Sequence, residues 1–114
     1  MRHLFTLSLA VLMISSTMQA DFVNGVSTCA ASGNKQVSTT GYNLYQLTIT
    51  AGSASAPNTG YVAIGGASVT TSNAPLLGPG YTANWNKPSA AINPASLYFA
   101  CTVSTDTIQW VGTR

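Results

Sequence analysis

Charge is the scarcest property of this chain, because charged side chains make up only 5% of its residues, against about a quarter in typical globular domains. Beyond residue 20 there is no histidine and no glutamate, and Asp21 and Asp106 are the carboxylates. The basic side chains there are Lys35, Lys87 and Arg114, so the net charge is three minus two, or +1. Such a weak and scattered positive charge cannot neutralise a run of phosphates, which argues against nucleic-acid binding by counterion release.

The same scarcity excludes most enzyme chemistry. A Ser–His–Asp triad needs a histidine, and general acid–base catalysis needs a titratable group close to the substrate. Asp106 falls in a predicted turn, where aspartate commonly binds the local backbone. Two cysteines without a histidine cannot complete a metal site, and neither GxxxxGK[ST] nor GxGxxG occurs. We therefore expect no enzyme activity, no cofactor and no metal.

Residues 1–20 follow the order of a secretory signal peptide. Arg2 and His3 give a basic start, Leu4–Ile14 is mostly apolar, and the segment ends on small and polar residues at Ala20. The apolar run is too short to span a hydrocarbon core of about 30 Å as a helix. We predict a leader over residues 1–20 and a single domain over 21–114. An uncleaved N-terminal helix or a misassigned start codon is the alternative.

Cys29 and Cys101 stand near the two ends of the predicted domain. Behind a secretory leader, an even pair of cysteines favours a disulfide. A bridge would close a loop of about 70 residues and would stabilise the domain by roughly 4 kcal/mol on the chain-entropy model. Two buried free thiols are the alternative, since cysteine is among the most buried residue types.

The remaining pattern is typical of an all-β protein. Short β-branched and aromatic runs are separated by Gly, Pro, Asn and Ser, and Tyr45, Leu47 and Ile49 alternate with polar residues. Seven or eight short strands at this spacing predict an antiparallel β-sandwich or a jelly-roll-like barrel. The expected strands are Val26–Ala31, Gln36–Thr40, Tyr42–Ala51, Tyr61–Gly65, Ala67–Thr70, Tyr81–Trp85, Leu97–Val103 and Ile108–Val111.

Three loops are the expected contact surfaces, because loops on a rigid scaffold carry most recognition. They cover residues 52–60, 71–80 and 86–94, and Pro79-Gly80 in the second favours a type II turn. The candidate contact residues are Asn58, Trp85, Asn86 and Lys87. Trp85 could instead anchor the core, and Trp110 is expected to lie in the core.

Residues 57–80, PNTGYVAIGGASVTTSNAPLLGPG, resemble a pattern of small structural proteins of tailed bacteriophages. The end of the chain is similar as well, with a strand of the Leu97–Val103 type, an Asp turn, and a last strand carrying Trp110. The resemblance spans about residues 42–112. The matching residues of the central pattern are Asn58, Gly60, Val62, Ile64, Gly65, Val69, Thr70, Leu77, Pro79 and Gly80.

The resemblance implies a virion component, such as a head decoration or cement protein, with no catalytic residue to carry over. Capsid or other virion proteins are the expected partners. Strand edges without charged residues also predict a homo-oligomer, because bare edges pair with other strands. The leader favours a different hypothesis, in which the chain is a secreted or periplasmic β-sandwich for adhesion or ligand binding, with no stable membrane span in the mature chain.

Overall fold

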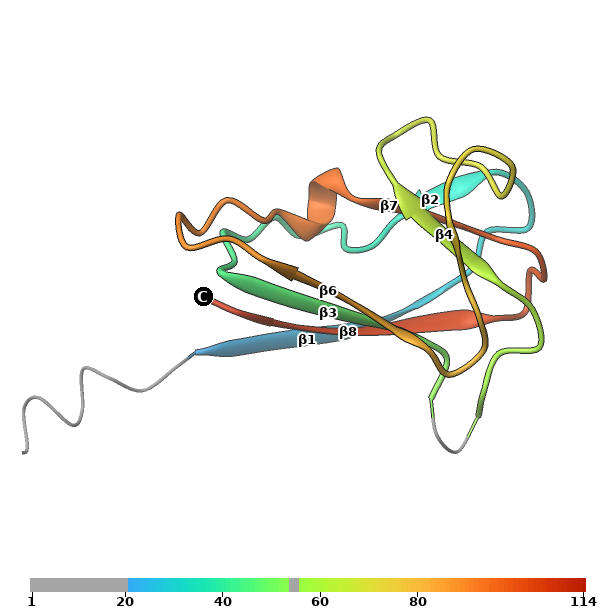
Figure 1. Ribbon diagram of the computed structural model, residues 1–114, viewed down its shortest axis with the longest axis horizontal. Coiled ribbons are helices and arrows are strands. Elements are labelled where there is room, and N and C mark those ends of the chain that lie inside the picture. The colour runs from blue at the N-terminus through green and yellow to red at the C-terminus, as the bar shows by residue number, and fades with distance from the viewer. Residues whose placement is uncertain (1–20, 54–55) are drawn as a thin grey trace, which may run out of the picture.

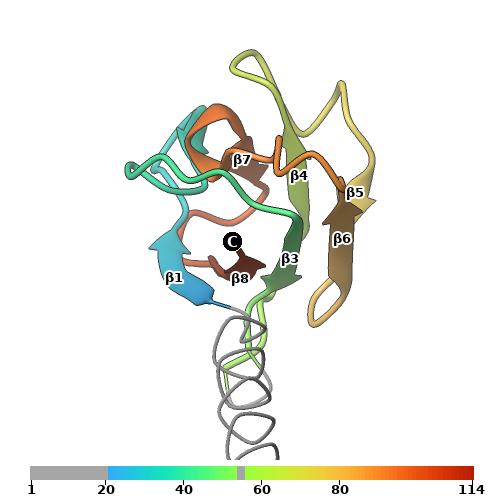
Figure 2. The same ribbon diagram turned by 90° about the vertical axis from the view of Figure 1, so that its left-hand side faces the viewer.

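The computed structural model describes residues 21–53 and 56–114, which form two four-stranded antiparallel sheets (Figure 1). The first sheet has the order β1-β8-β3-β6 and the second the order β2-β7-β4-β5. Figure 2 shows the sheets as two layers. The strands are β1 (Phe22–Thr28), β2 (Asn34–Gln36), β3 (Gln46–Ala51), β4 (Val62–Gly65), β5 (Leu76–Leu77), β6 (Thr82–Asn86), β7 (Tyr98–Cys101) and β8 (Thr107–Thr113), with one 3-10 turn, η1 (Pro94–Ser96), before β7.

Side-chain alternation along the strands separates the core from the surface, as the sequence predicts. In β8, Ile108 and Trp110 are buried, while Gln109 and Val111 are exposed. The core between the sheets is apolar and contains Cys29, Val37, Leu44, Leu47, Ile49, Ala51, Val62, Ile92, Phe99, Ile108 and Trp110. The predicted all-β class, with eight short strands in two antiparallel sheets, is confirmed for the described residues.

The outer face of the first sheet carries no charged side chain, and it is polar over β3 and β6. Thr48 donates a hydrogen bond from its hydroxyl to Oδ1 of Asn84 at 2.7 Å, and the hydroxyls of Thr50 and Thr82 lie 3.1 Å apart. These residues are direct cross-strand neighbours. Such pairs contribute to sheet stability, so this face is held by local hydrogen bonds in place of ion pairs.

Three local predictions are wrong. The strand expected over Gln36–Thr40 is β2, which spans Asn34–Gln36 and ends where the predicted strand begins. Residues 67–70 form a turn, because the amide of Val69 donates to the carbonyl of Gly66 at 3.0 Å; Val69 is nevertheless buried. The loop predicted over residues 71–80 contains β5, whose Leu76 and Leu77 pair with β4. A strand of two residues has no periodicity to detect.

The first strand begins earlier than predicted, at Phe22. It pairs with β8 without interruption, from Phe22 opposite Thr113 to Thr28 opposite Thr107. This pairing accommodates Gly25 and Trp110 opposite each other, and a Cβ at Gly25 would lie 2.7 Å from the indole Nε1. Glycine therefore leaves the room that the indole ring needs. Trp110 lies in the core, as predicted.

The turn predicted at Pro79-Gly80 is confirmed. The amide of Tyr81 donates to the carbonyl of Gly78 at 3.0 Å, and Gly80 has φ of +78°. A positive φ at the third position is the mark of a type II turn.

The predicted leader, residues 1–20, lies outside the described residues. Among those that are described, no helix is long and apolar enough to cross a membrane.

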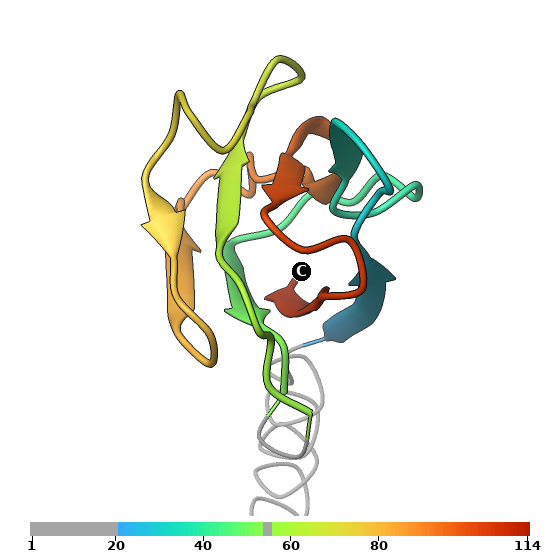
Figure 3. The ribbon, with the colours of Figure 1, turned by 90° about the vertical axis from the view of Figure 1, so that its right-hand side faces the viewer.

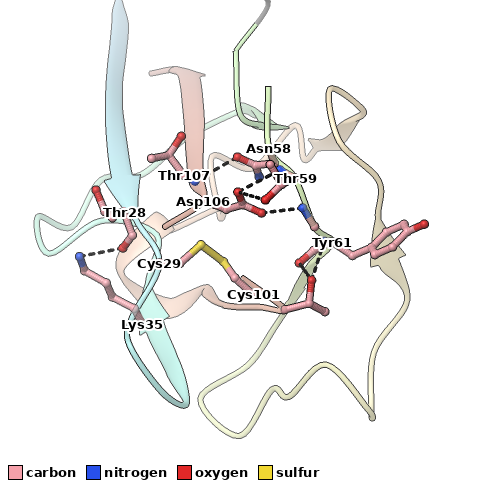
Figure 4. Close-up of a disulfide and its surroundings, with 11 residues drawn as sticks. Thr28, Cys29, Lys35, Asn58, Thr59, Tyr61, Cys101, Asp106 and Thr107 are labelled. Carbon is pink, nitrogen blue, oxygen red and sulfur yellow. Dashed lines mark hydrogen bonds between the residues drawn. A yellow bond between two sulfur atoms is a disulfide. The ribbon is translucent and has the colours of Figure 1, made fainter. Parts of the chain in front are cut away.

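Cys29 and Cys101 form a disulfide, with Cα atoms 6.0 Å apart. Cys29 directly follows β1 in the first sheet, and Cys101 ends β7 in the second. The bond therefore links the two layers covalently (Figure 4). It confirms the pairing that the sequence favours over two free thiols.

Removing the disulfide should lower the free energy of unfolding by about 4 kcal/mol, because the bond closes a loop with a sequence separation of 72. Urea unfolding of the non-reduced protein and of the Cys29→Ala/Cys101→Ala variant measures the difference. A reductant should lower the stability of the natural protein towards that of the variant and leave the variant unchanged. Equal stability of the natural protein with and without reductant would contradict the expectation.

Candidate contact surface

Asp106 is the buried charge of the domain, at 5% exposure. Its carboxylate accepts hydrogen bonds from the amide of Thr59 at 3.0 Å, from the hydroxyl of Thr59 at 3.2 Å and from the amide of Gly60 at 2.8 Å (Figure 4). The amide of Asp106 donates to Val103 within the predicted turn. The carboxylate, however, binds the distant segment that enters β4. It fastens that segment to the start of β8.

Asn58 was expected at a contact surface, and the structure places it in the interior, at 6% exposure. Its Oδ1 accepts a hydrogen bond from the amide of Thr107 at 3.0 Å. Its Nδ2 is buried without a hydrogen-bond partner among the described residues. Asn58 and Asp106 therefore form reciprocal links between residues 58–60 and 106–107, and Asn58 is unavailable to a partner.

The residues of the phage-like pattern hold this part of the scaffold together. A Cβ at Gly60 would collide with the side chains of Thr102 and Val103. Val62 is fully buried and pairs with Leu77. With Asn58 inside and Gly80 in the type II turn, the pattern describes how β4 and β5 are built. It does not describe an exposed site.

Trp85, Asn86 and Lys87 are adjacent in sequence but face different surroundings. Trp85 is half-buried and packs against the core, while Asn86 and Lys87 are exposed. The amide of Lys87 donates to the carbonyl of Tyr45 at 2.8 Å, which fixes the end of β6. Asn58 and Trp85–Lys87 consequently do not form one surface.

Trp85 lies in a groove lined by residues of both sheets. On this side the edge strands β5 and β6 run next to each other (Figure 3). The groove has a volume of about 220 Å³. Its lining is apolar and consists of Val62, Ile64, Pro75, Leu76, Leu77, Ala83 and Trp85. The sandwich is thus incompletely closed along this side, and Leu76 is 47% exposed there.

Two exposed tyrosines adjoin this side of the molecule. Tyr61 is 49% exposed and Tyr81 is 69% exposed. A Cβ at Gly78 would lie 3.0 Å from the ring of Tyr81 and 3.7 Å from the ring of Tyr61. Glycine thus leaves room for both rings, and Figure 4 shows Tyr61 pointing away from the disulfide. We call Tyr61, Gly78 and Tyr81 the tyrosine patch.

Sequence reasoning did not single out these tyrosines. Tyr61 and Tyr81 directly precede β4 and β6, so their backbones are held by the sheets. The type II turn at Pro79-Gly80 was predicted, but the proximity of residue 61 to that turn depends on the pairing of β4 with β5. Only the tertiary structure shows that the two rings share a surface.

The groove and the tyrosine patch are lined by uncharged side chains. Among residues 21–53 and 56–114, no group of three or more His, Cys, Asp or Glu could hold a metal ion. Lys35 Nζ donates to the carbonyl of Thr28, and Arg114 forms an ion pair with Asp21. Tyrosine is enriched in protein interfaces because it combines apolar area with a hydroxyl group.

No family model matches the chain, and no curated protein matches its sequence. Among solved structures, a chain of the capsid asymmetric unit of cyanophage Pam1 is similar, with a TM-score of 0.33 and 10% identity over 84% of this chain and 85% of that chain. A TM-score of this size does not establish a shared fold, so the role of that capsid is not extended to this chain.

Replacing Asp106 by Asn should destabilise the domain by about 3 kcal/mol, because buried donors then lose a charged acceptor. Thermal and urea unfolding measure the change. Asp21→Asn is the matched control: its ion pair with Arg114 is exposed, so its loss should cost less than about 1 kcal/mol. Equal effects of the two substitutions would contradict a special role for Asp106.

Proposed function

We propose that this chain is a non-enzymatic structural protein of a virion that decorates or cements the capsid surface. The observation that carries the proposal is that the residues of the phage-like pattern form one continuous structural unit. Its residues build β4, β5 and the turn after β5, and the tyrosine patch stands at the ends of this unit. The residues that resemble phage structural proteins therefore form the scaffold that holds the tyrosine patch at the surface.

The rigidity of the domain supports the proposal. A decoration protein is exposed to proteases and must keep its shape without turnover. The disulfide joins the sheets, and the Asp106 carboxylate fastens residues 59 and 60 to the start of β8. Both devices act at the same end of the sandwich (Figure 4), and they restrict opening of the layers.

The neutral surface also supports attachment to protein. The outer face of the first sheet consists of Thr, Asn and Gln side chains, with Phe22, Val26 and Val111 as its exposed apolar residues. Contacts made by such a surface depend on shape and hydrogen bonds, and salt screens them little. The proposed partners are capsid proteins and further copies of this chain, with no nucleic acid.

A second candidate is an exported β-sandwich for adhesion or ligand binding. The disulfide favours it, because such bonds persist in oxidising compartments and are compatible with an extracellular location. The intact mass of the non-reduced native protein separates the candidates. A mass equal to Asp21–Arg114 less two hydrogens, found free of particles, favours the exported module; recovery with particles favours the virion protein.

The virion role predicts that the chain is found in purified phage particles from its source and that the tyrosine patch attaches it to them. The Tyr61→Ala/Tyr81→Ala variant should bind particles that lack the protein at least about tenfold more weakly, because losing two interface tyrosines commonly costs more than 1.4 kcal/mol. Co-sedimentation of added protein with particles measures the binding.

Tyr45→Ala is the matched control, since Tyr45 is exposed next to the start of β3, away from the patch. It should bind as the natural protein does. Absence of the chain from all particles would refute the virion role. Unchanged binding of the double variant would refute the patch as the attachment site and leave the role itself intact.

A further inference from the structure

The first strand is an unguarded sheet edge. β1 is an end strand of the first sheet, is seven residues long, and contains neither a charged residue nor proline. Natural edge strands are usually short or carry such residues, because a bare edge pairs with other chains. The other edges follow the rule: β5 has two residues, β2 has three and contains Lys35, and β6 is followed by Lys87 and Pro88.

Alternation shows which backbone groups of β1 are free. The carbonyl of Asp21 accepts from the amide of Arg114, and the amide of Cys29 donates to Asp106, so odd-numbered residues direct their backbone groups towards β8. Those of Phe22, Asn24 and Val26 therefore point outwards. Within residues 21–53 and 56–114, these outward backbone groups have no hydrogen-bond partner. Figure 2 shows β1 at one margin of its sheet.

The side chains at these positions complement a second copy of the same strand. Phe22 is 66% exposed and Val26 is 65% exposed, both on the outer face. In an antiparallel pair centred on Asn24, Phe22 of one copy lies opposite Val26 of the other, and the two Asn24 side chains lie opposite each other. Aromatic and β-branched residues are favourable cross-strand neighbours. Each pair would also exchange both of its backbone hydrogen bonds.

The structure selects this register over those centred on Gly25 or Val26. A shift of the centre to Gly25 or Val26 requires the carbonyl of Thr28, which already accepts from Lys35 Nζ at 3.0 Å. In the pairing centred on Asn24, no pair within the described strand needs that carbonyl. This register also places Asp21 of one copy opposite Ser27 of the other, beside the Lys35 ammonium. Asp21 is already paired with Arg114 of its own chain, so the ends of the pair add little attraction, and no like charges face each other.

We propose that two copies of this chain associate through antiparallel pairing of β1 about a two-fold axis at Asn24, which joins their first sheets into one continuous sheet. This is an isologous contact, in which the same strand of each copy forms the interface. The pairing depends on the edge strand alone and holds for either candidate function.

Sedimentation equilibrium of the non-reduced full chain tests the proposal with three variants. The natural protein is expected at twice the chain mass. Asn24→Lys should be monomeric, because two ammonium groups would face each other at the axis. Asn24→Asp should also be monomeric, because two carboxylates would face each other at the axis. Asn84→Lys makes the same change on β6, at the other edge of the sheet, and should remain dimeric.

An equimolar mixture of Asn24→Lys and Asn24→Asp should recover the dimer mass, because the axis pairs residue 24 with residue 24. Recovery would also show that the variants are folded. A monomeric natural protein, a dimeric Asn24→Lys variant or a monomeric Asn84→Lys variant would overturn pairing through β1. A mixture that stays monomeric would overturn the register. All these measurements use purified protein, so particle attachment is tested separately.

Discussion

The burial of one carboxylate organises the end of the sandwich that carries the phage-like pattern. Asp106 has left water, so its oxygens need donors from the protein, and Thr59 and Gly60 supply them. That requirement fixes the entry into β4 next to the start of β8, in the other sheet. The position of Tyr61 follows directly, since it is the next residue. The disulfide adds a covalent link nearby, so the sheets are joined by a polar and a covalent tie at one end.

Scarcity of charge shapes the rest of the molecule. Arg114 pairs with Asp21 and stands 5.7 Å from the centre of the Tyr42 ring, while Lys35 binds a backbone carbonyl. These cations are held against their own chain. A surface with so few free charges excludes neighbours poorly, because like-charge repulsion is a main defence against association. Low charge therefore favours association, and the geometry of the edges selects where it takes place.

The sequence predicted well those features that depend on neighbouring residues, such as a strand or a turn. Alternation identified β3, and Pro79-Gly80 identified the type II turn. Trp110 was expected in the core because a domain this small needs most of its aromatic residues there, and it is buried. The role of Asn58 could not be predicted, because its partner Thr107 is 49 positions away and a polar residue in a loop is usually exposed. The tyrosine patch could not be predicted for the same reason. Its two rings come to lie beside Gly78 only after β5, a strand too short to show a pattern, has paired with β4.

The two proposed surfaces lie on different sides of the domain, and this placement links them. β1 is one edge of the first sheet and β6 is the other, and Tyr81 directly precedes β6. A dimer formed through β1 therefore leaves both tyrosine patches exposed and directed away from the two-fold axis. On a capsid, whose subunits repeat, the second patch would bind at the high effective concentration set by the first. Two small neutral contacts, each weak alone, would then hold the pair firmly, which suits a chain with too little charge for attraction at long range.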